Sequence, residues 1–230
     1  MKICGLQKLT LLDFPGLAAC TVFTPGCNFR CPFCHNAGLV VEKSDDYYTE
    51  NQIFEYLATR KGKLDGVCIT GGEPLLQFGI EDFIAKIKEA GFKVKLDTNG
   101  SLHEKLVSVV NSGLVDYVAM DIKNSKANYA KSAGTEVNIK NVEKSVEFLK
   151  TCGIDHEFRT TVVKELNSKE DMIEIAKWLK GEKKYFLQSF KDSGHVIKSG
   201  LSAYSPAEMR ELLSAVKENG VPCAELRGVD

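Results

Sequence analysis

Hydrophobic residues repeat along the chain with two different periods, and the alternation between these periods predicts the secondary structure. Short runs rich in β-branched and aromatic residues are typical of strands. Between them, apolar residues recur every three or four positions, which indicates amphipathic helices. The predicted strands are residues 20–24, 67–70, 93–97, 117–121, 158–163 and 185–190.

Capping signals bound the predicted helices between these strands. Over residues 80–90, apolar side chains at positions i, i+3, i+4 and i+7 form one face, and Gly91 follows as a stop signal. A serine followed three residues later by a glutamate predicts capping boxes at Ser101 and Ser205. Further helices are predicted from near Thr49, over 101–113, over 141–150, over 168–181 and over 205–220.

This order of elements predicts an α/β fold. Strand–helix units in series form a parallel sheet with right-handed crossovers. A complete (β/α)8 barrel takes about 250 residues, whereas this chain has 230 residues and six predicted units. We therefore expect a partial (β/α)6 barrel that is open on one side, with a doubly wound open sheet as the alternative. Because no linker or repeat divides the chain, residues 1–230 are expected to form a single domain.

Composition argues against some classes of partner. The formal net charge is −1, so the charge balance does not favour nucleic acid or an anionic membrane. No apolar run approaches the roughly 20 residues of a membrane span. The first residues lack the continuous apolar segment of a secretory signal. We therefore expect a cytoplasmic protein with neither a nucleic-acid partner nor a membrane partner.

Three of the eight cysteines lie close together: Cys27, Cys31 and Cys34 have the spacing C-x3-C-x2-C, and His35 follows. Such a group indicates a metal site. A structural zinc could take His35 as its fourth ligand, although adjacent Cys34 and His35 would then have to reach one tetrahedron. Thiolates equally suit an iron–sulfur cluster. Three thiolates on a four-iron cluster would leave one iron free to bind another ligand.

The other five cysteines are scattered, and we expect them to be small buried hydrophobic residues in a reducing compartment. They are Cys4, Cys20, Cys68, Cys152 and Cys223.

Unusual polar residues follow the next three predicted strands. In such folds the chemistry takes place at the carboxyl ends of the strands. The motifs at these ends are GGEP (71–74), DTNG (97–100) and MDIK (120–123). Each alone could be a turn, a helix cap or a set of surface charges. Together they form a ring of oxygen ligands and hydrogen-bonding groups that suits a polar, charged cofactor, and Lys123 adds a cation for a carboxylate.

The stretch GCNFRCPFCHN (26–36), with GGEP downstream, resembles the radical S-adenosylmethionine (SAM) enzymes, whose defining motif has this cysteine spacing. Within that family, CHN, DTNG and MDIK are similar to the proteins that activate glycyl radical enzymes. LLDFPG (11–16), followed closely by the cysteine motif, most resembles the longer form of the anaerobic ribonucleoside-triphosphate reductase activating proteins. The resemblance implies a radical SAM fold with a [4Fe-4S] cluster and SAM as cofactors.

The resemblance also implies roles for individual residues. The three clustered cysteines would hold three irons, and the fourth iron would bind the amino and carboxylate groups of SAM. In the similar pyruvate formate-lyase activating enzyme, the positions of Asp97, Thr98 and Asp121 hold a monovalent cation. The residues implied to form the SAM site are Phe33, Asn36, Gly71, Gly72, Glu73, Pro74, Asp97, Thr98, Asn99, Asp121, Lys123 and Arg159.

The implied substrate is another protein. Related activating enzymes have DGPG where this chain has DFPG (13–16), and the resemblance implies that Asp13 engages the glycine loop of the partner. SAM would be cleaved reductively, and a backbone glycine of a glycyl radical enzyme would lose a hydrogen atom. The implied partner is anaerobic ribonucleoside-triphosphate reductase, with flavodoxin or ferredoxin as electron donor.

Three alternatives remain open at this point: activation of another glycyl radical enzyme such as pyruvate formate-lyase, a radical SAM reaction on a small molecule as in deazapurine synthesis, and a zinc-stabilised interaction module. Lys191 stands where the pyruvate formate-lyase activator has a histidine near the ribose. His35, Lys191 and His195 receive no role.

Overall fold

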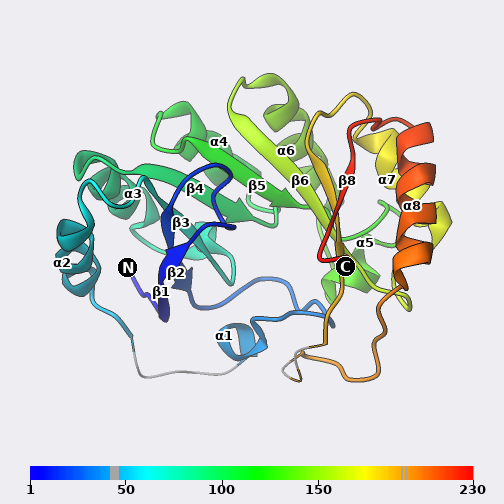
Figure 1. Cartoon of the computed structure of the whole chain (residues 1–230), viewed down its shortest axis with the longest axis horizontal. Coiled ribbons are helices and arrows are strands. Elements are labelled where there is room, and N and C mark those ends of the chain that lie inside the picture. Colours follow the sequence, from blue (N-terminus) through cyan, green and yellow to red (C-terminus); the bar gives the residue numbers. More distant parts are fainter. Residues whose placement is uncertain (42–46, 193, 195, 230) are drawn as a thin grey trace.

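One mixed sheet organises the fold. The computed structural model describes residues 1–41, 47–192, 194 and 196–229, and its strands follow chain order across the sheet (Figure 1). β1 pairs with β2 in the antiparallel sense, and every later pair of neighbours is parallel. The strands are β1 (Gly5–Thr10), β2 (Ala19–Thr24), β3 (Gly66–Gly71), β4 (Lys93–Thr98), β5 (Tyr117–Asp121), β6 (Asp155–Val162), β7 (Tyr185–Ser189) and β8 (Glu225–Arg227).

Strands β2 to β7 are the six predicted strands, and the predicted open α/β architecture is confirmed. The strand order never reverses. Because right-handed crossovers along an unreversed sheet place the connecting helices on one face, the long helices cover the convex side (Figure 1). The doubly wound alternative is wrong, since it needs helices on both faces of the sheet.

The longer helices agree with the sequence prediction. They are α2 (Glu50–Arg60), α3 (Ile80–Glu89), α4 (His103–Asn111), α6 (Ile139–Thr151), α7 (Lys169–Trp178) and α8 (Pro206–Glu218). Capping boxes begin three of them, at Thr49, Ser168 and Ser205. None of the described helices is long and apolar enough to cross a bilayer.

The capping box predicted at Ser101 is wrong. Helix α4 begins at His103, and its N-cap residue, Leu102, offers no side-chain hydrogen bond. The Ser101 hydroxyl instead donates to Asn99 Oδ1 at 2.6 Å. A serine side chain bonded within the preceding turn cannot also accept from the first turn of the helix.

The elements that the sequence prediction missed are short or lie at an edge. β1 has three consecutive exposed residues, and β8 has only three residues. Helices α1 (Ala37–Val41) and α5 (Tyr129–Ala133) have five residues each, and the 3-10 turn η1 (Pro74–Leu76) has three. Segments this short do not complete the repeat from which a period is recognised.

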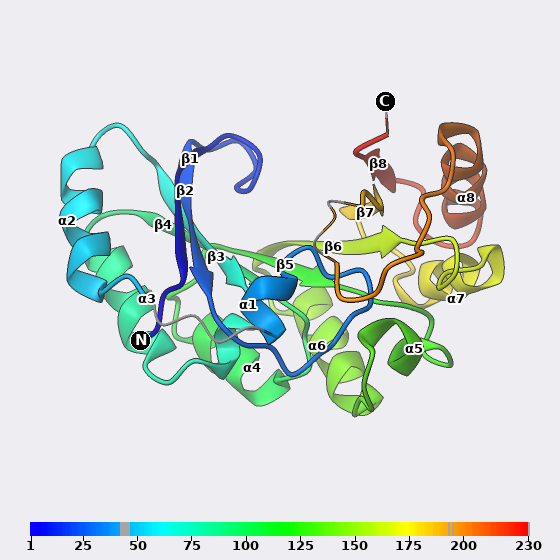
Figure 2. The same ribbon diagram turned by 90° about the horizontal axis from the view of Figure 1, so that it is seen from below.

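The strands present apolar side chains to the helices and polar ones to the concave side. On β4, Leu96 is fully buried in the main core, whereas Asp97 lines the concave cavity. Because successive residues of a strand point to opposite faces, charged residues two apart on one strand share the concave face. The β1–β2 hairpin loop lies at the opposite end of the sheet from α1 (Figure 2), since it precedes β2 and α1 follows it.

Candidate active site

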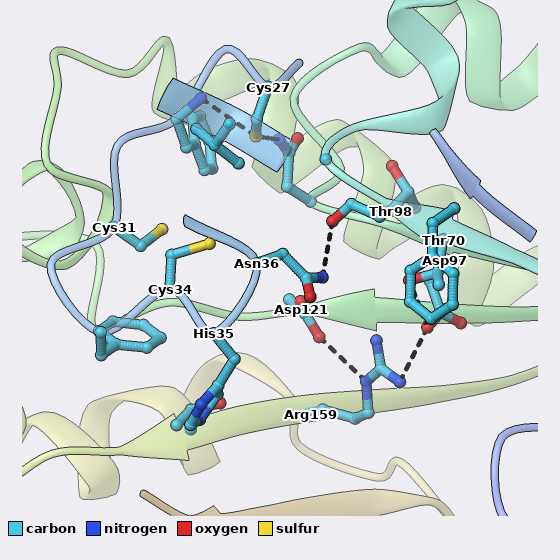
Figure 3. Close-up of a pocket in the computed structure, with 18 of the residues that line it drawn as sticks. Cys27, Cys31, Cys34, His35, Asn36, Thr70, Asp97, Thr98, Asp121 and Arg159 are labelled. Atoms are coloured by element: carbon cyan, nitrogen blue, oxygen red, sulfur yellow. Dashed lines mark hydrogen bonds and ion pairs between the residues drawn. The ribbon is translucent and has the colours of Figure 1, made fainter. Parts of the chain in front are cut away.

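A cavity of about 450 Å³ lies on the concave face and extends to the β1–β2 hairpin (Figure 3). Glu73 and Pro74 are buried and lie outside its lining. The cavity brings together the other predicted site residues, namely Asp13, Cys27, Cys31, Phe33, Cys34, Asn36, Gly71, Gly72, Asp97, Thr98, Asn99, Asp121, Lys123 and Arg159. Motifs from four strand ends and one hairpin therefore converge on one space.

The cysteine loop after β2 is joined by its backbone to the GGEP loop after β3. The Glu73 N–H donates to Gly26 O and the Gly72 N–H donates to Thr24 O, both at 2.8 Å. A Cβ atom on Gly72 would lie 1.8 Å from Gly26 O. The glycine in this position therefore permits two loops to approach each other, which is a structural requirement beyond any contact with a ligand.

Three thiols line one end of the cavity. Burial raises the pKa of Cys27 and Cys34, and it raises the pKa of Cys31 to about 11. The Phe29 N–H donates to Cys27 Sγ at 3.3 Å. Within the described residues, no three His, Cys, Asp or Glu side chains converge closely enough to hold a single metal ion. The three thiols are therefore too far apart to bind a single metal ion together. Any metal that binds them would have to displace their protons.

His35 does not turn toward the thiols. Its ring packs against Phe190 with the centroids 5.8 Å apart, and burial lowers its pKa. The next residue, Asn36, donates from Nδ2 to Gly71 O at 2.9 Å and so ties the cysteine loop to β3. Lys191 is exposed, and His195 lies outside the described residues.

The centre of the cavity holds a network of alternating charges (Figure 3). Arg159 Nε lies 2.9 Å from Asp121 Oδ1, and Arg159 Nη1 lies 3.3 Å from Asp97 Oδ2. Lys123 Nζ lies 2.9 Å from the other oxygen of Asp121, and Lys95 pairs with Asp97. Three cations therefore hold two carboxylates on adjacent strands.

These contacts explain the protonation states of the two aspartates. Burial raises the pKa of Asp121, but the charges of Arg159 and Lys123 lower it more, so it lies well below the usual range. For Asp97, burial is likewise outweighed by Arg159 and Lys95, and its pKa is lowered. Both carboxylates are ionised at neutral pH, so their positions depend on the cations between them.

Glu73 acts inside the protein wall rather than in the cavity. Its carboxylate accepts from Thr98 Oγ1 at 2.9 Å, from the Asn99 N–H at 2.7 Å and from the Leu75 N–H at 3.2 Å. Burial raises its pKa to about 7 although these hydrogen bonds oppose the shift. The carboxylate joins the GGEP and DTNG motifs, so it positions residues that do line the cavity.

Several lining residues were missed in the sequence, including Gln7, Thr21, Thr70, Thr161 and Gln188. None belongs to a recognisable motif. The two-residue period of the strands could have found Thr161, because it follows Arg159 by two positions and so faces the same side. Thr21 could not be found in this way, because its donation to Asp13 Oδ2 at 2.5 Å depends on the hairpin.

The fold and the site together define an open α/β barrel with three soft metal ligands at one end of its cavity. The sequence model of the Radical SAM superfamily matches residues 21–179, and the chain belongs to this superfamily. The family implies a [4Fe-4S] cluster and SAM. The three cysteines fit the cluster, because they are the soft donors it requires and they line one end of a single cavity.

Similar proteins are found over most of the chain. A Methanocaldococcus jannaschii protein described as "Putative glycyl-radical enzyme activating enzyme" is 33% identical over 224 residues, which cover 94% of this chain and 92% of that protein. GTP 3′,8-cyclase of Helicobacter pylori is 28% identical over 83% of this chain and 60% of its own length. Pyruvate formate-lyase-activating enzyme of Staphylococcus aureus is 36% identical over 41% of this chain and 40% of its own length.

Among solved structures, Streptococcus suis SuiB bound to precursor peptide SuiA superposes with a TM-score of 0.72 at 18% identity. The match covers 90% of this chain and 48% of SuiB. At this identity the likeness shows the shared fold alone.

Proposed function

We propose that this protein activates a glycyl radical enzyme by removing a hydrogen atom from one of its backbone glycines. The partner that we propose is anaerobic ribonucleoside-triphosphate reductase. The observation that carries the proposal is the cavity, which has the three thiols at one end and Asp13 in its lining as well. The similarity to the Methanocaldococcus jannaschii protein along 94% of this chain supports it. The resemblance of LLDFPG to the longer ribonucleotide reductase activators favours that partner.

The cofactors would supply the radical chemistry. One electron from a flavodoxin or ferredoxin would allow SAM to be converted to methionine and 5′-deoxyadenosine. The hydrogen atom gained by 5′-deoxyadenosine would come from the partner's glycine. Cys27, Cys31 and Cys34 would hold the cluster. Phe33, whose ring lies 5.9 Å from Lys123 Nζ, and Asn36 would border the SAM site.

The remaining lining residues would bind and orient SAM. The glycines Gly71 and Gly72 would offer backbone groups to the methionine ammonium, and Lys123 would face the carboxylate. Arg159 holds Asp97 and Asp121 in place before SAM arrives, so little reorganisation is needed on binding. We also propose a monovalent cation beside Asp97, Thr98 and Asp121, which would share these carboxylates with Arg159.

The test is an anaerobic incubation of the reduced protein with SAM and purified candidate glycyl radical enzymes. We expect a glycyl radical doublet in the EPR spectrum of anaerobic ribonucleoside-triphosphate reductase, together with 5′-deoxyadenosine formation. A doublet on pyruvate formate-lyase alone would reassign the partner. SAM cleavage without a radical on any glycyl radical enzyme would contradict the proposal.

A second candidate is a radical SAM reaction on a small molecule, in the manner of deazapurine synthesis. The similarity to GTP 3′,8-cyclase over 83% of this chain favours it. In this case a nucleotide added without any partner protein would raise the rate of SAM cleavage, and a modified nucleotide would appear by mass spectrometry. If nucleotides change neither the rate nor the products, this candidate is wrong.

A further inference from the structure

The β1–β2 hairpin exposes three large apolar side chains, one near the end of β1 and two in the loop. Leu9, Leu11 and Leu12 are 58%, 70% and 90% exposed, and we call them the leucine tip. They are close together in sequence at one end of the sheet, on the side opposite to α1 (Figure 2). Leucines this exposed in adjacent positions are unusual on a surface that contacts only water.

The leucine tip is held firmly to the sheet. Phe14 is 3% exposed, and its ring packs against Tyr117 with the centroids 6.1 Å apart. The Leu12 and Asp13 N–H groups both donate to Thr10 Oγ1, at 3.2 and 3.1 Å. The buried ring and the two hydrogen bonds fix the direction of the loop, so the exposure of the leucines is built into the fold.

The same hairpin also lines the reaction cavity. Asp13 accepts from Thr21 Oγ1 and faces the cavity, and Gln7 of β1 lines it too. Leu12, which is 90% exposed, immediately precedes Asp13 in the chain. The exposed leucine tip and the cavity lining therefore meet at neighbouring residues of one hairpin.

The occupant that fits is a polypeptide. A small substrate inside a cavity of about 450 Å³ could not cover leucines that lie outside its lining. A second copy of this chain fits poorly, because a stable interface needs about 800 Å² from each partner, and three leucine side chains offer much less. A small apolar patch beside a reaction cavity suits a transient contact with a protein substrate.

We propose that the leucine tip is the docking surface for the partner protein, where it contacts apolar side chains that flank the reactive glycine. The proposal rests on the proposed function and extends it by locating the surface outside the cavity that captures the partner. The apolar contact supplies affinity, and Asp13, one residue further along the chain, would then meet the glycine segment.

The experiment compares Leu11→Ser/Leu12→Ser with the wild type and with Phe78→Ser. Phe78 is 97% exposed and follows β3, at the other end of the sheet, so it is a matched control for loss of surface apolarity. Glycyl radical formation is measured by EPR against partner concentration. We expect at least a tenfold higher KM for the partner in the double variant, with an unchanged KM in the control and unchanged urea unfolding in both.

Each outcome separates the two proposals. If the wild type forms the radical and the double variant has the same KM, the docking surface is wrong and the proposed function stands. If the wild type cleaves SAM but forms no radical on any candidate partner, the proposed function fails and the docking surface fails with it. A wild-type dimer that the double variant dissociates, seen by sedimentation, would assign the tip to self-association and overturn the proposal. Leu12→Lys, a single change at the most exposed position, repeats the test if the double variant misfolds.

Discussion

Arg159 is the residue on which the charge network of the cavity depends. It contacts carboxylates from two neighbouring strands, Asp97 on β4 and Asp121 on β5, and its side chain is only 14% exposed. Removing one partner of a buried ion pair leaves an uncompensated charge, which costs more than the pair itself contributes. Arg159 therefore determines both the stability of this site and the positions of its two carboxylates.

We expect Arg159→Met to lower the free energy of unfolding by about 3–5 kcal/mol at pH 7. The two aspartates have lowered pKa values when folded, so they contribute stability above their ordinary pKa of about 4 and lose it as the pH falls through the folded values. The difference in the free energy of unfolding between the wild type and the variant should therefore become smaller below about pH 4. Anaerobic urea unfolding at a series of pH values measures this difference. The control is Lys177→Met, which breaks an exposed ion pair with Glu174. It should lower the free energy of unfolding by less than about 1 kcal/mol.

Asp13 provides a second test at the same scale. Asp13→Asn keeps the size of the side chain and removes its charge. Because Asp13 is proposed to meet the partner, we expect the rate of glycyl radical formation to fall at least tenfold, and SAM cleavage without partner to fall much less. Equal losses in both assays would show that Asp13 serves SAM instead.

At the scale of the element, a close contact between Phe14 and Gly66 helps to anchor the β1–β2 hairpin to β3. A Cβ atom on Gly66 would lie 2.9 Å from the Phe14 ring and 3.0 Å from Lys93 O. The start of β3 therefore has a glycine because the ring of Phe14 occupies the space above it. The large side chain of Phe14 therefore fills a site in the wall and leaves Asp13 free to face the cavity.

A double-mutant cycle tests this anchor. We expect Phe14→Ala to cost about 3 kcal/mol through the cavity it leaves, and Gly66→Ala to cost about 1–3 kcal/mol through overpacking. In the Phe14→Ala background the new methyl group no longer meets the ring and keeps only the close contact with Lys93 O, so Gly66→Ala should cost less by at least about 1 kcal/mol. Additive costs in urea unfolding would show that the two positions do not share this contact.

At the scale of the whole molecule, a charged contact holds the edge strand β8 to the rest of the sheet. β8 is short, and Arg227 joins it to the buried carboxylate of Glu157 on β6 through two hydrogen bonds of 2.8 and 2.9 Å. The Tyr117 hydroxyl donates to the same carboxylate at 3.1 Å. Burial raises the pKa of Glu157, but Arg227 and Arg159 lower it more, so the carboxylate is charged and needs its partner.

We expect Arg227→Met to lower the free energy of unfolding by about 3 kcal/mol and to speed amide hydrogen exchange in β7 and β8 but not in β2 to β4. The same change in a Glu157→Gln background should cost clearly less, because no uncompensated charge remains. An equal cost in both backgrounds would mean that Arg227 acts through its packing on the Phe186 ring, 3.4 Å away, rather than through the carboxylate.

The agreement between sequence and structure depends on how locally a feature is encoded. The capping box predicted at Ser205 is a four-residue signal, and the structure contains it. At Ser101 the same kind of signal failed, because Asn99 competes for the hydroxyl. Glu73 was expected at a ligand, yet it lies in the wall, because its hydrogen-bond partners come from a motif about 25 residues away.

The sequence alone determined the series of strands and helices, the superfamily and the three cysteines, because each follows from periods or spacings within a few tens of residues. Only the tertiary structure decided that the helices cover one face, that Phe14 is buried while Leu12 is exposed, and that Arg159 lies between two aspartates. These arrangements depend on side chains that meet across strands far apart in the chain, and no local pattern contains that information. The cysteine spacing indicates the cofactor, whereas the folded hairpin indicates where a partner would dock.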